Sequence, residues 1–487
     1  MTLEDLAGAR WTDGWHETAR AALADALAGG AGRYPSAGSK LVDIRAPQLK
    51  EEDAPFAALI HPSNPTAGGY SGMSFVLFPS SDGPPMAAMV VGTLGLGEDS
   101  MILSRPGHGR RLGAFTRWLN DTYGNGNLIA WTKSDPTRLD QDVPAELKSQ
   151  FDAHRAAFSK YGKVIYSFCV PPEDNPRAMH DALFGFLDLA MEEREVRPLS
   201  GARQDANRLK GSYLNSVMPD LTVVGVVELL SQRRFAVIEG PPGTGKTRLA
   251  LEVLHGQYQG RGKSVQFHPG TTYESFVGGL APVAAAGAAG LQFEPRPGHL
   301  MLAATEARRC APEPFLLHID EINRADLSKV LGEAIYLLEA SSERPRVITL
   351  SHDFGPMAPE GEFALPDNLH ILGTMNSADR SIAILDVAVR RRFAFAKLWP
   401  QRSVVEGSAP TMQEAFDRLF QIFTDFAGEE SFNLMPGHSY FIDAHEASAR
   451  KSLKLNLAPL LEEYLAQGYL PGFAEQIRAY LQWIESL

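Results

Sequence analysis

Hydrophobic and polar positions follow different patterns on the two sides of residue 200. In the first part, short apolar runs bounded by turn residues predict three strands, at 74–78, 86–92 and 164–170. Apolar positions at helical spacing predict three helices, over 14–28, 112–123 and 181–195. These elements predict an α+β domain over residues 1–200, with a linker at 197–205.

From about residue 208, apolar strands alternate with amphipathic helices, which is the pattern of a parallel α/β sheet. Its candidate strands lie at 234–240, 263–269, 314–320, 369–376 and 392–399. A tract of small residues at 281–290 predicts a flexible surface loop. After about residue 411 the strand patterns stop and helical patterns dominate. The sequence thus predicts an α/β domain over 208–405 and a small helical domain over 411–487.

Composition narrows the class of protein. The 487 residues are 44% hydrophobic and 21% charged, which excludes global disorder and fits a globular chain. The chain has no apolar run long enough to span a membrane, and its first residues lack the apolar core of a secretory signal. Two distant cysteines, Cys169 and Cys310, exclude a disulfide framework and favour a cytoplasmic protein. The net charge of −12 is spread evenly, so neither part is a basic nucleic-acid module by bulk charge.

The string GPPGTGKT at residues 240–247 carries the strongest chemical signal. It follows a predicted strand and opens a predicted helix, which is the context of a phosphate-binding loop. Glycines let backbone N–H groups surround phosphates, while the lysine reaches the β- and γ-phosphates and the last threonine offers a hydroxyl to Mg²⁺. The candidate nucleotide-binding residues are Gly240, Pro241, Pro242, Gly243, Thr244, Gly245, Lys246 and Thr247.

Polar residues at the ends of two later strands extend this candidate site. Asp320 and Glu321 end the run PFLLHIDE, where Asp320 can hold the water shell of Mg²⁺ and Glu321 can orient or deprotonate the attacking water. Asn376 ends the strand at 369–376 and can bond the γ-phosphate or that water. The structural alternatives are a helix cap for the two acids and an Asx turn for Asn376.

Three consecutive arginines lie in the string LDVAVRRRF at 385–393. A guanidinium fork matches phosphate oxygens, so Arg390 and Arg391 can act on the γ-phosphate held by a neighbouring subunit. The alternative is a solvated basic face.

Together these motifs resemble an AAA+ NTPase, and longer strings narrow the resemblance to the McrB family. These strings are QFHPGTTYESFVGG (266–279), DEINRADLSKVLGEAIYLLE (320–339), LPDNLHILGTMNSADRSIAILDVAVRRRF (365–393), GHSYF (437–441) and LAPLLEEYL (457–465). The stretches 347–354 and 361–366 resemble the insertion hairpin that precedes the sensor strand in this family. The resemblance covers residues 208–470, and its one departure is Ser377 in place of the usual threonine, which keeps the hydroxyl.

The resemblance implies an AAA+ core with a helical lid and an N-terminal recognition or assembly domain, acting in DNA restriction or anti-phage defence. It implies Mg²⁺ and either GTP, which is the usual nucleotide of the family, or ATP. It makes Asp379 part of the hydrolysis signature and makes Arg390 and Arg391 arginine fingers that act in trans. Such fingers imply a ring, expected to be a hexamer. No nuclease motif is apparent in the chain, so a separate McrC-like subunit is expected to cut DNA.

Two regions keep two interpretations each. In GHSYF, His438 and Tyr440 either knit the lid to the core, which is the preferred interpretation, or contact the nucleotide. In the N-terminal domain, the stretch 104–120 combines basic and aromatic residues that would suit a reader of modified bases, or it is a solvated helix face with its aromatic residues in the core. The residues concerned are Arg105, Arg110, Arg111, Phe115, Arg117 and Trp118. That domain could equally recognise a protein or assemble the complex.

Two other function classes compete with a DNA-targeting motor. A MoxR-like ATPase would use the same core to remodel proteins or insert metals, with the N-terminal domain docking its clients. A nucleotide-gated assembly protein would need little hydrolysis, and the intact Glu321 argues against it.

Overall fold

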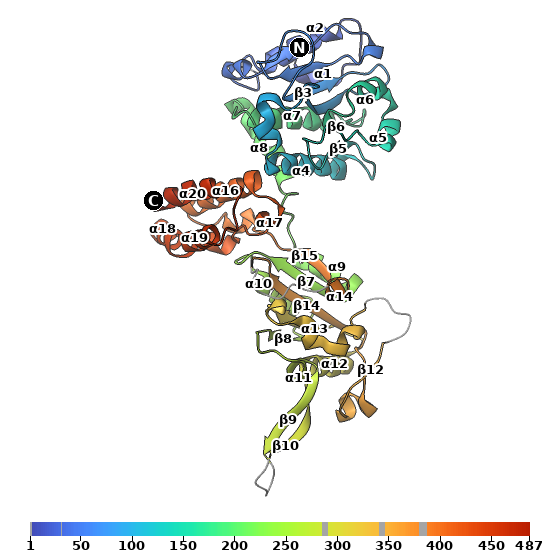
Figure 1. Ribbon diagram of the computed structural model, residues 1–487, viewed down its shortest axis with the longest axis vertical. Helices are drawn as coiled ribbons and strands as arrows, with labels where there is room; N and C mark the ends of the chain where they lie inside the picture. Colours follow the sequence, from blue (N-terminus) through green and yellow to red (C-terminus); the bar gives the residue numbers. More distant parts are fainter. Residues whose placement is uncertain (1, 31, 285–290, 340–345, 379–386) are drawn as a thin grey trace. The chain divides into compact units, whose positions relative to one another are not determined.

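The computed structural model describes residues 2–30, 32–284, 291–339, 346–378 and 387–487 (Figure 1). The chain forms two compact units. The first unit is Met1–Met218 with Thr424–Ala427, and the second is Pro219–Phe423 with Gly428–Leu487. In the described ranges, no helix is long and apolar enough to cross a membrane. Most of the predicted α/β domain (208–405) and helical domain (411–487) lies in the second unit, but residues 208–218 and 424–427 belong to the first. The boundary between these two predicted domains stays a prediction.

The first unit is built on an antiparallel six-stranded sheet in the order β1-β2-β3-β4-β6-β5. Its strands are β1 (Asp43–Arg45), β2 (Ala57–Ile60), β3 (Met73–Phe78), β4 (Met86–Val91), β5 (Ala130–Thr132) and β6 (Ile165–Cys169). Its helices are α1 (Leu3–Ala7), α2 (Trp15–Ala26), α3 (Ser100–Leu103), α4 (Pro106–Tyr123), α5 (Ala145–Gln150), α6 (Arg155–Tyr161), α7 (Pro176–Glu192) and α8 (Ser200–Leu214). Every residue of β2, β3, β4 and β6 is buried, so both faces of the sheet are covered. The predicted α+β class is confirmed, and the three predicted strands lie within one residue of their observed ends.

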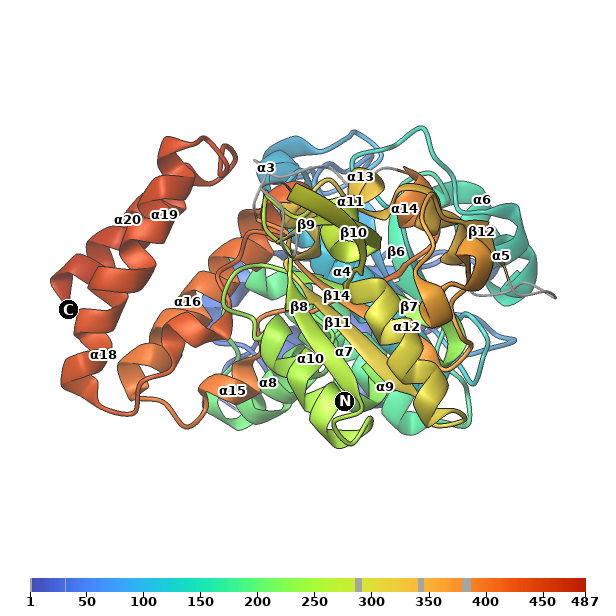
Figure 2. The same cartoon turned by 90° about the horizontal axis from the view of Figure 1, so that it is seen from below.

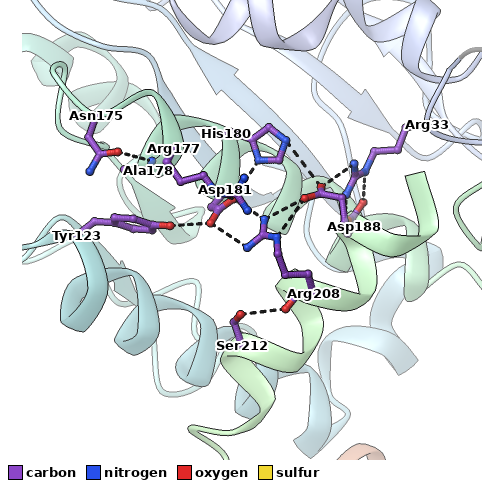
Figure 3. Close-up of polar contacts among 11 residues, drawn as sticks. Arg33, Tyr123, Asn175, Arg177, Ala178, His180, Asp181, Asp188, Arg208 and Ser212 are labelled. Atoms are coloured by element: carbon purple, nitrogen blue, oxygen red, sulfur yellow. Dashed lines mark hydrogen bonds and ion pairs between the residues drawn. The ribbon is translucent and has the colours of Figure 1, made fainter. Parts of the chain in front are cut away.

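The predicted linker at 197–205 is wrong, because Ser200 begins helix α8. The sequence of α8 is polar, but ion pairs hold this helix against the rest of the first unit (Figure 3). Arg208 Nη2 lies 2.7 Å from Asp181 Oδ1 of α7, and the Tyr123 hydroxyl donates to Asp181 Oδ2 at 2.7 Å. Burial raises the pKa of Asp181, but bonds from His180 and Arg208 hold it well below the ordinary value.

The second unit contains a five-stranded parallel sheet in the order β15-β7-β14-β11-β8. Its strands are β7 (Phe235–Gly240), β8 (Gly262–Gln266), β11 (Phe315–Asp320), β14 (Leu369–Asn376) and β15 (Ala394–Lys397). All five were predicted, and the three central strands β7, β11 and β14 are the short apolar runs between helices that buried parallel strands form. Parallel register brings their carboxyl ends to one edge, where Asn376 pairs with Gly240 and Asp320 with Gln266.

Alternate residues of strand β7 face opposite layers of helices. The helices of this α/β part are α9 (Val223–Arg233), α10 (Lys246–Gly256), α11 (Tyr273–Phe276), α12 (His299–Cys310), α13 (Leu327–Leu331) and α14 (Val387–Arg390). Ala236 and Ile238 of β7 pack with α9 and α10, whereas Phe235 and Val237 belong to the core that includes α12 and α13. The three central strands are therefore buried on both faces, and polar residues lie at the carboxyl edge of the sheet.

A hairpin and a helical group complete the second unit. Strands β9 (Gly278–Ala284) and β10 (Leu291–Pro297) pair antiparallel. The predicted loop at 281–290 is therefore wrong for 281–284, and the remainder, 285–290, lies outside the described residues. Alanine has a low strand propensity, so we attribute the strand at 281–284 to its backbone pairing with β10. The insertion hairpin is confirmed, since β12 (Ile348–Thr349) pairs with β13 (Glu362–Phe363).

The C-terminal part is helical, as predicted. Figure 2 shows its helices grouped in the red part of the chain. They are α15 (Arg402–Val405), α16 (Pro410–Phe426), α17 (Glu429–Phe432), α18 (Glu446–Ser452), α19 (Ala458–Ala466) and α20 (Ala474–Ser486).

Candidate functional site

The loop between β7 and α10 has the backbone of a phosphate-binding loop. Gly243 and Gly245 have φ angles of 80° and 79°, in the left-handed region where side chains other than glycine are strained. Gly245 caps α10, whose first N–H groups lack helical partners. The Thr244 hydroxyl donates to the carbonyl of Pro241 at 3.0 Å and braces the turn. Loop and helix start therefore present N–H groups in the way that anion sites require.

Lys246 lies across this loop. Its Nζ donates to the carbonyls of Gly240 and Pro241, both at 2.9 Å, and the residue is 9% exposed. Burial lowers the pKa of Lys246 to about 8, although Glu321 and Asp320 raise it. The cation predicted for the phosphates is thus held at the loop by carbonyls that a phosphate can replace.

Asp320 is fixed by two hydroxyls at the end of β11. Its Oδ1 accepts from Thr247 Oγ1 at 2.8 Å and from Thr374 Oγ1 at 2.5 Å. His318 lies beneath it, fully buried, with Nε2 3.9 Å from that oxygen and Nδ1 2.8 Å from Ser264 Oγ. Burial lowers the pKa of His318, which favours the neutral imidazole. The expected pair of metal-binding residues, Thr247 and Asp320, is in direct contact.

Glu321 begins a short 3-10 helix, Ile322–Arg324, in a strained conformation. Its φ and ψ are 53° and 47°, and its N–H donates to Thr374 Oγ1 at 3.3 Å. The carboxylate lies 3.4 Å from Arg324 Nε and makes no capping bond. The helix-cap alternative is therefore absent for Glu321, and Asp320 is bonded to Thr247 and Thr374 instead. Non-glycine residues in such backbone regions concentrate at functional sites.

Asn376 takes part in a turn beside the phosphate loop. Its Oδ1 accepts from the N–H of Ala378 at 3.1 Å, so the predicted Asx turn is present. The next residue, Ser377, donates its N–H to the carbonyl of Gly240 at 3.0 Å. The turn therefore keeps Asn376 against the loop, and the two interpretations of this residue are compatible.

The arginine run lies apart from these contacts. Arg390 ends α14, and both Arg390 and Arg391 are exposed. The guanidinium of Arg390 lies 5.4 Å from the ring centre of Phe395. This exposure fits a solvated face and fits a contact with a neighbouring subunit equally well. Asp379 lies outside the described residues.

The segment GHSYF packs directly on the phosphate loop, which confirms the preferred interpretation. Gly437 donates its N–H to the carbonyl of Pro242 at 2.9 Å, and Ser439 donates to that of Gly243 at 3.0 Å. A side chain on Gly437 would meet the carbonyl carbon of Gly243 at 2.0 Å, so only glycine fits. His438 is buried, and its Nδ1 accepts from the N–H of Gln401 at 3.2 Å.

Three residues near Asp320 were not predicted from the sequence. Thr374, His318 and Ser264 lie inside strands, where they resemble ordinary buried positions. One signal was available for the threonine. Side chains alternate along a strand, so a hydroxyl two residues before Asn376 shares its face.

The arginine-rich stretch of the N-terminal unit is largely committed to internal ion pairs. Arg111 is 4% exposed and lies 2.5 Å from Glu193, which Arg105 also contacts at 3.3 Å. Burial alone would raise the pKa of Glu193, but His108 and Arg111 lower it to about 2. The expectation of a solvated face is thus wrong for Arg111, because α4 begins at Pro106 and buries this side. Phe115 is in the core as expected, and Arg117 is exposed.

A cavity of about 490 Å³ opens on the other side of the same unit. Four rings and a buried hydroxyl are among its lining groups, from Phe56, Tyr70, Ser74, Phe78 and Tyr161. Lys160 also lines it, and none of the lining residues is acidic. The cavity therefore suits a flat, uncharged or anionic group rather than a cation.

Comparisons with known proteins agree with the geometry of the second unit. Residues 236–393 match the AAA domain of the dynein-related subfamily. The chain is 28% identical over 365 residues to the Type IV methyl-directed restriction enzyme EcoKMcrB subunit of Escherichia coli (strain K12), covering 67% of this chain and 76% of that protein. It is 32% identical over 202 residues to the Type II restriction enzyme BsuMI component YdiS of Bacillus subtilis (strain 168), covering 35% of this chain and 58% of that protein. With its phosphate loop, its paired acids and its parallel sheet, the region 236–393 is an AAA domain of the P-loop NTPase type, in a chain that is similar to the McrB subunit.

Proposed function

We propose that this NTPase is the ring-forming motor of a restriction system that acts on modified DNA, with a separate McrC-like nuclease subunit that cuts. The observation that carries the proposal is the convergence of Lys246, Asp320, Glu321 and Asn376 at one edge of the sheet in a chain similar to McrB. The two relatives named above are both restriction components, which supports a place in DNA defence.

The groups at the site fit a magnesium nucleotide. Hydroxyl and carboxylate oxygens are the ligands that Mg²⁺ prefers, and Thr247 and Asp320 supply one of each. Bound Mg²⁺ would neutralise charge on the β- and γ-phosphates. The backbone N–H groups of residues 240–247 and the Lys246 ammonium would hold the phosphate oxygens. Glu321 would take the proton of the attacking water, and Asn376 and Asp379 would orient the water or the γ-phosphate.

The nucleotide proposed is GTP, on the strength of the likeness to McrB, and ATP is its competitor. The phosphate loop contacts phosphates rather than bases, so its residues do not discriminate between the two. A ring, expected to be a hexamer, would complete each site with Arg390 or Arg391 of the next subunit. Both side chains are exposed, as such a contact requires.

In the N-terminal unit we propose the cavity, rather than helix α4, as the recognition pocket for a modified base. Its rings can stack on an extruded base, and Ser74 and Tyr70 offer hydroxyls to the base edge. Of the stretch first considered for DNA, exposed Arg117 stays a candidate for phosphate contact, whereas Arg105 and Arg111 are paired with Glu193. Arg110 and Trp118 are both partly buried and stay candidates outside the cavity, although the guanidinium of Arg110 donates to the carbonyls of Thr424 and Ala427.

The decisive experiment measures NTP turnover by the full chain with GTP and with ATP. Each nucleotide is tested alone, with unmethylated DNA, with methylated DNA of the same sequence, and with the candidate nuclease subunit. We expect turnover of GTP and DNA cleavage only when modified DNA and the nuclease are both present. Turnover that ignores DNA and nuclease, and changes with a protein client, would replace this proposal with protein remodelling.

Nucleotide binding above pH 8 is expected to take up a proton at Lys246. Burial sets the pKa of this ammonium at about 8, so about half of the free sites have lost the proton at that pH. Bound phosphates favour the charged form and raise the pKa, so the proton returns on binding. Calorimetry at pH 8.5 in two buffers with different ionisation enthalpies measures this uptake. Lys246→Arg, which stays charged, should show none, and equal uptake by that variant would place the proton elsewhere.

Replacing Tyr161 with leucine is expected to weaken binding of modified DNA about tenfold, since loss of one stacked ring costs about 1–3 kcal/mol. Affinity for unmodified DNA and basal NTP turnover should not change. Gel-shift titrations of the full chain with matched modified and unmodified duplexes measure the difference. Tyr469→Leu in the second unit serves as the control. Equal affinity of Tyr161→Leu and the parent chain for modified DNA would remove the cavity from the proposal.

A further inference from the structure

We propose that Thr374 is a positioning residue that fixes both acids of the hydrolysis site through a single hydroxyl. Thr374 lies near the end of β14 and is 2% exposed. Its Oγ1 is 2.5 Å from Asp320 Oδ1 and 3.3 Å from the backbone nitrogen of Glu321. This inference rests on the proposed NTP hydrolysis. It adds Thr374, on the strand next to β11, to the residues of the hydrolysis site.

The chemistry of the two bonds fixes their directions. A backbone N–H can only donate, so the Thr374 oxygen accepts from Glu321. An ionised carboxylate can only accept, so the Thr374 proton goes to Asp320. One hydroxyl is therefore used on both sides, and a side chain without it would lose both bonds at once.

The bond to Asp320 matters because it gives this oxygen a second hydroxyl donor. Thr247 Oγ1 also donates to Asp320 Oδ1, at 2.8 Å. Thr247 would in addition hold Mg²⁺ through an oxygen lone pair, whereas the hydroxyl of Thr374 would keep only the carboxylate and the Glu321 N–H as partners. We infer that Thr374 maintains the position of Asp320 toward the metal through nucleotide binding and release.

The bond to Glu321 matters because of its backbone. Glu321 has a φ of 53°, which residues other than glycine rarely adopt. Its N–H leaves the β11 ladder at this point and finds its partner on β14. Thr374 therefore supports the backbone turn at Glu321, where β11 ends and the 3-10 helix Ile322–Arg324 begins. Its effect on hydrolysis is through Glu321 and Asp320, and Thr374 itself is not placed in contact with the nucleotide.

The test compares Thr374→Val with Thr374→Ser. Valine keeps the shape and loses both bonds, whereas serine keeps the hydroxyl. Outer-shell partners of this kind change metal affinity or activity by about 10- to 100-fold. We expect Thr374→Val to lower kcat by about that factor and to raise the Mg²⁺ concentration for half-maximal binding of a non-hydrolysable nucleotide. Affinity for metal-free nucleotide should stay within about twofold, and Thr374→Ser should restore most of the loss.

Thr305→Val is the matched control, because its hydroxyl bonds only the Met301 carbonyl within α12, at 2.9 Å. It should change neither kcat nor the Mg²⁺ dependence. Thermal unfolding of each variant reports on folding. A Thr374→Val protein with the parent's kcat and Mg²⁺ midpoint would overturn the inference. Equal losses of kcat and of affinity for metal-free nucleotide in Thr374→Val, not restored in Thr374→Ser, would also overturn it. Such losses indicate general damage to the fold. If the parent chain hydrolyses no NTP, the proposed function fails, while the Mg²⁺ titration still decides the role of Thr374.

Discussion

Glu321→Gln is expected to lower NTP turnover by about 10²- to 10⁴-fold and to leave nucleotide binding intact. Glutamine keeps the size of the side chain and can still form hydrogen bonds, but it cannot accept the proton of the attacking water. The turn should survive the change, because Thr374 holds the backbone N–H of residue 321 rather than its side chain. Arg324, which lies 3.4 Å from the carboxylate, is exposed to solvent, and the buried Lys246 keeps Asp320 and its two carbonyl acceptors when the charge of Glu321 is lost.

Single-turnover kinetics measure the chemical step of this variant, and calorimetry with GTP and ATP measures binding. Glu252→Gln is the control, because Glu252 is exposed on α10 and pairs only with Arg248, four residues earlier. Both variants should bind nucleotide like the parent, and only Glu321→Gln should lose turnover. Normal turnover by Glu321→Gln would move the general base to another residue.

Arg391→Ala is expected to lose about 10³-fold in turnover, and mixing it with Glu321→Gln should restore part of the activity. An arginine that reaches the γ-phosphate of a neighbour contributes about this factor. In a mixed ring, some interfaces pair an intact Glu321 from one subunit with an intact Arg391 from the next. At equal amounts and random assembly this holds for about one interface in four, because ring contacts are head to tail. Activity should therefore peak near equal mixing.

Subunit exchange has to be shown independently, for example by energy transfer between labelled chains. Arg390→Ala is carried through the same mixtures, since the two exposed arginines are adjacent. If subunits exchange but the mixtures with Arg390→Ala and with Arg391→Ala both stay inactive, the arginines are interpreted as a solvated basic face. Arg402→Ala is a control, because Arg402 pairs with Asp417 on the lid.

The sequence was sufficient for those parts of the molecule whose signals are local. The strands β7, β11 and β14 of the second unit were predicted because each is a short apolar run, and the alternation of strands with helices implied that the carboxyl ends share one edge. The phosphate loop was predicted because the φ angles of Gly243 and Gly245 admit few other residues. The clustering of Asp320 and Asn376 at that edge followed from the parallel order.

Features that depend on distant partners could not be predicted. Arg111 and α8 carry charges that normally indicate solvent, and ion pairs with residues distant in the sequence, among them Glu193 and Asp181, make their packed positions favourable. The alanines of β9 form a strand because β10 supplies their hydrogen bonds. Thr374 acts across two strands, so its role follows from the register between β14 and β11 and not from its neighbours in the sequence.

The contact between Gly437 and the phosphate loop makes the lid part of the binding cradle. Two main-chain hydrogen bonds join residues 437–439 to Pro242 and Gly243, with no side chain between the backbones. Backbone joined to backbone tolerates little sliding, so a shift of the loop on nucleotide loss has to be passed to the lid helices. The lid would then register whether the pocket is full and relay that state to whatever surface it touches in a ring. In such an assembly, the order in which subunits hydrolyse nucleotide would depend on the main-chain contact at Gly437.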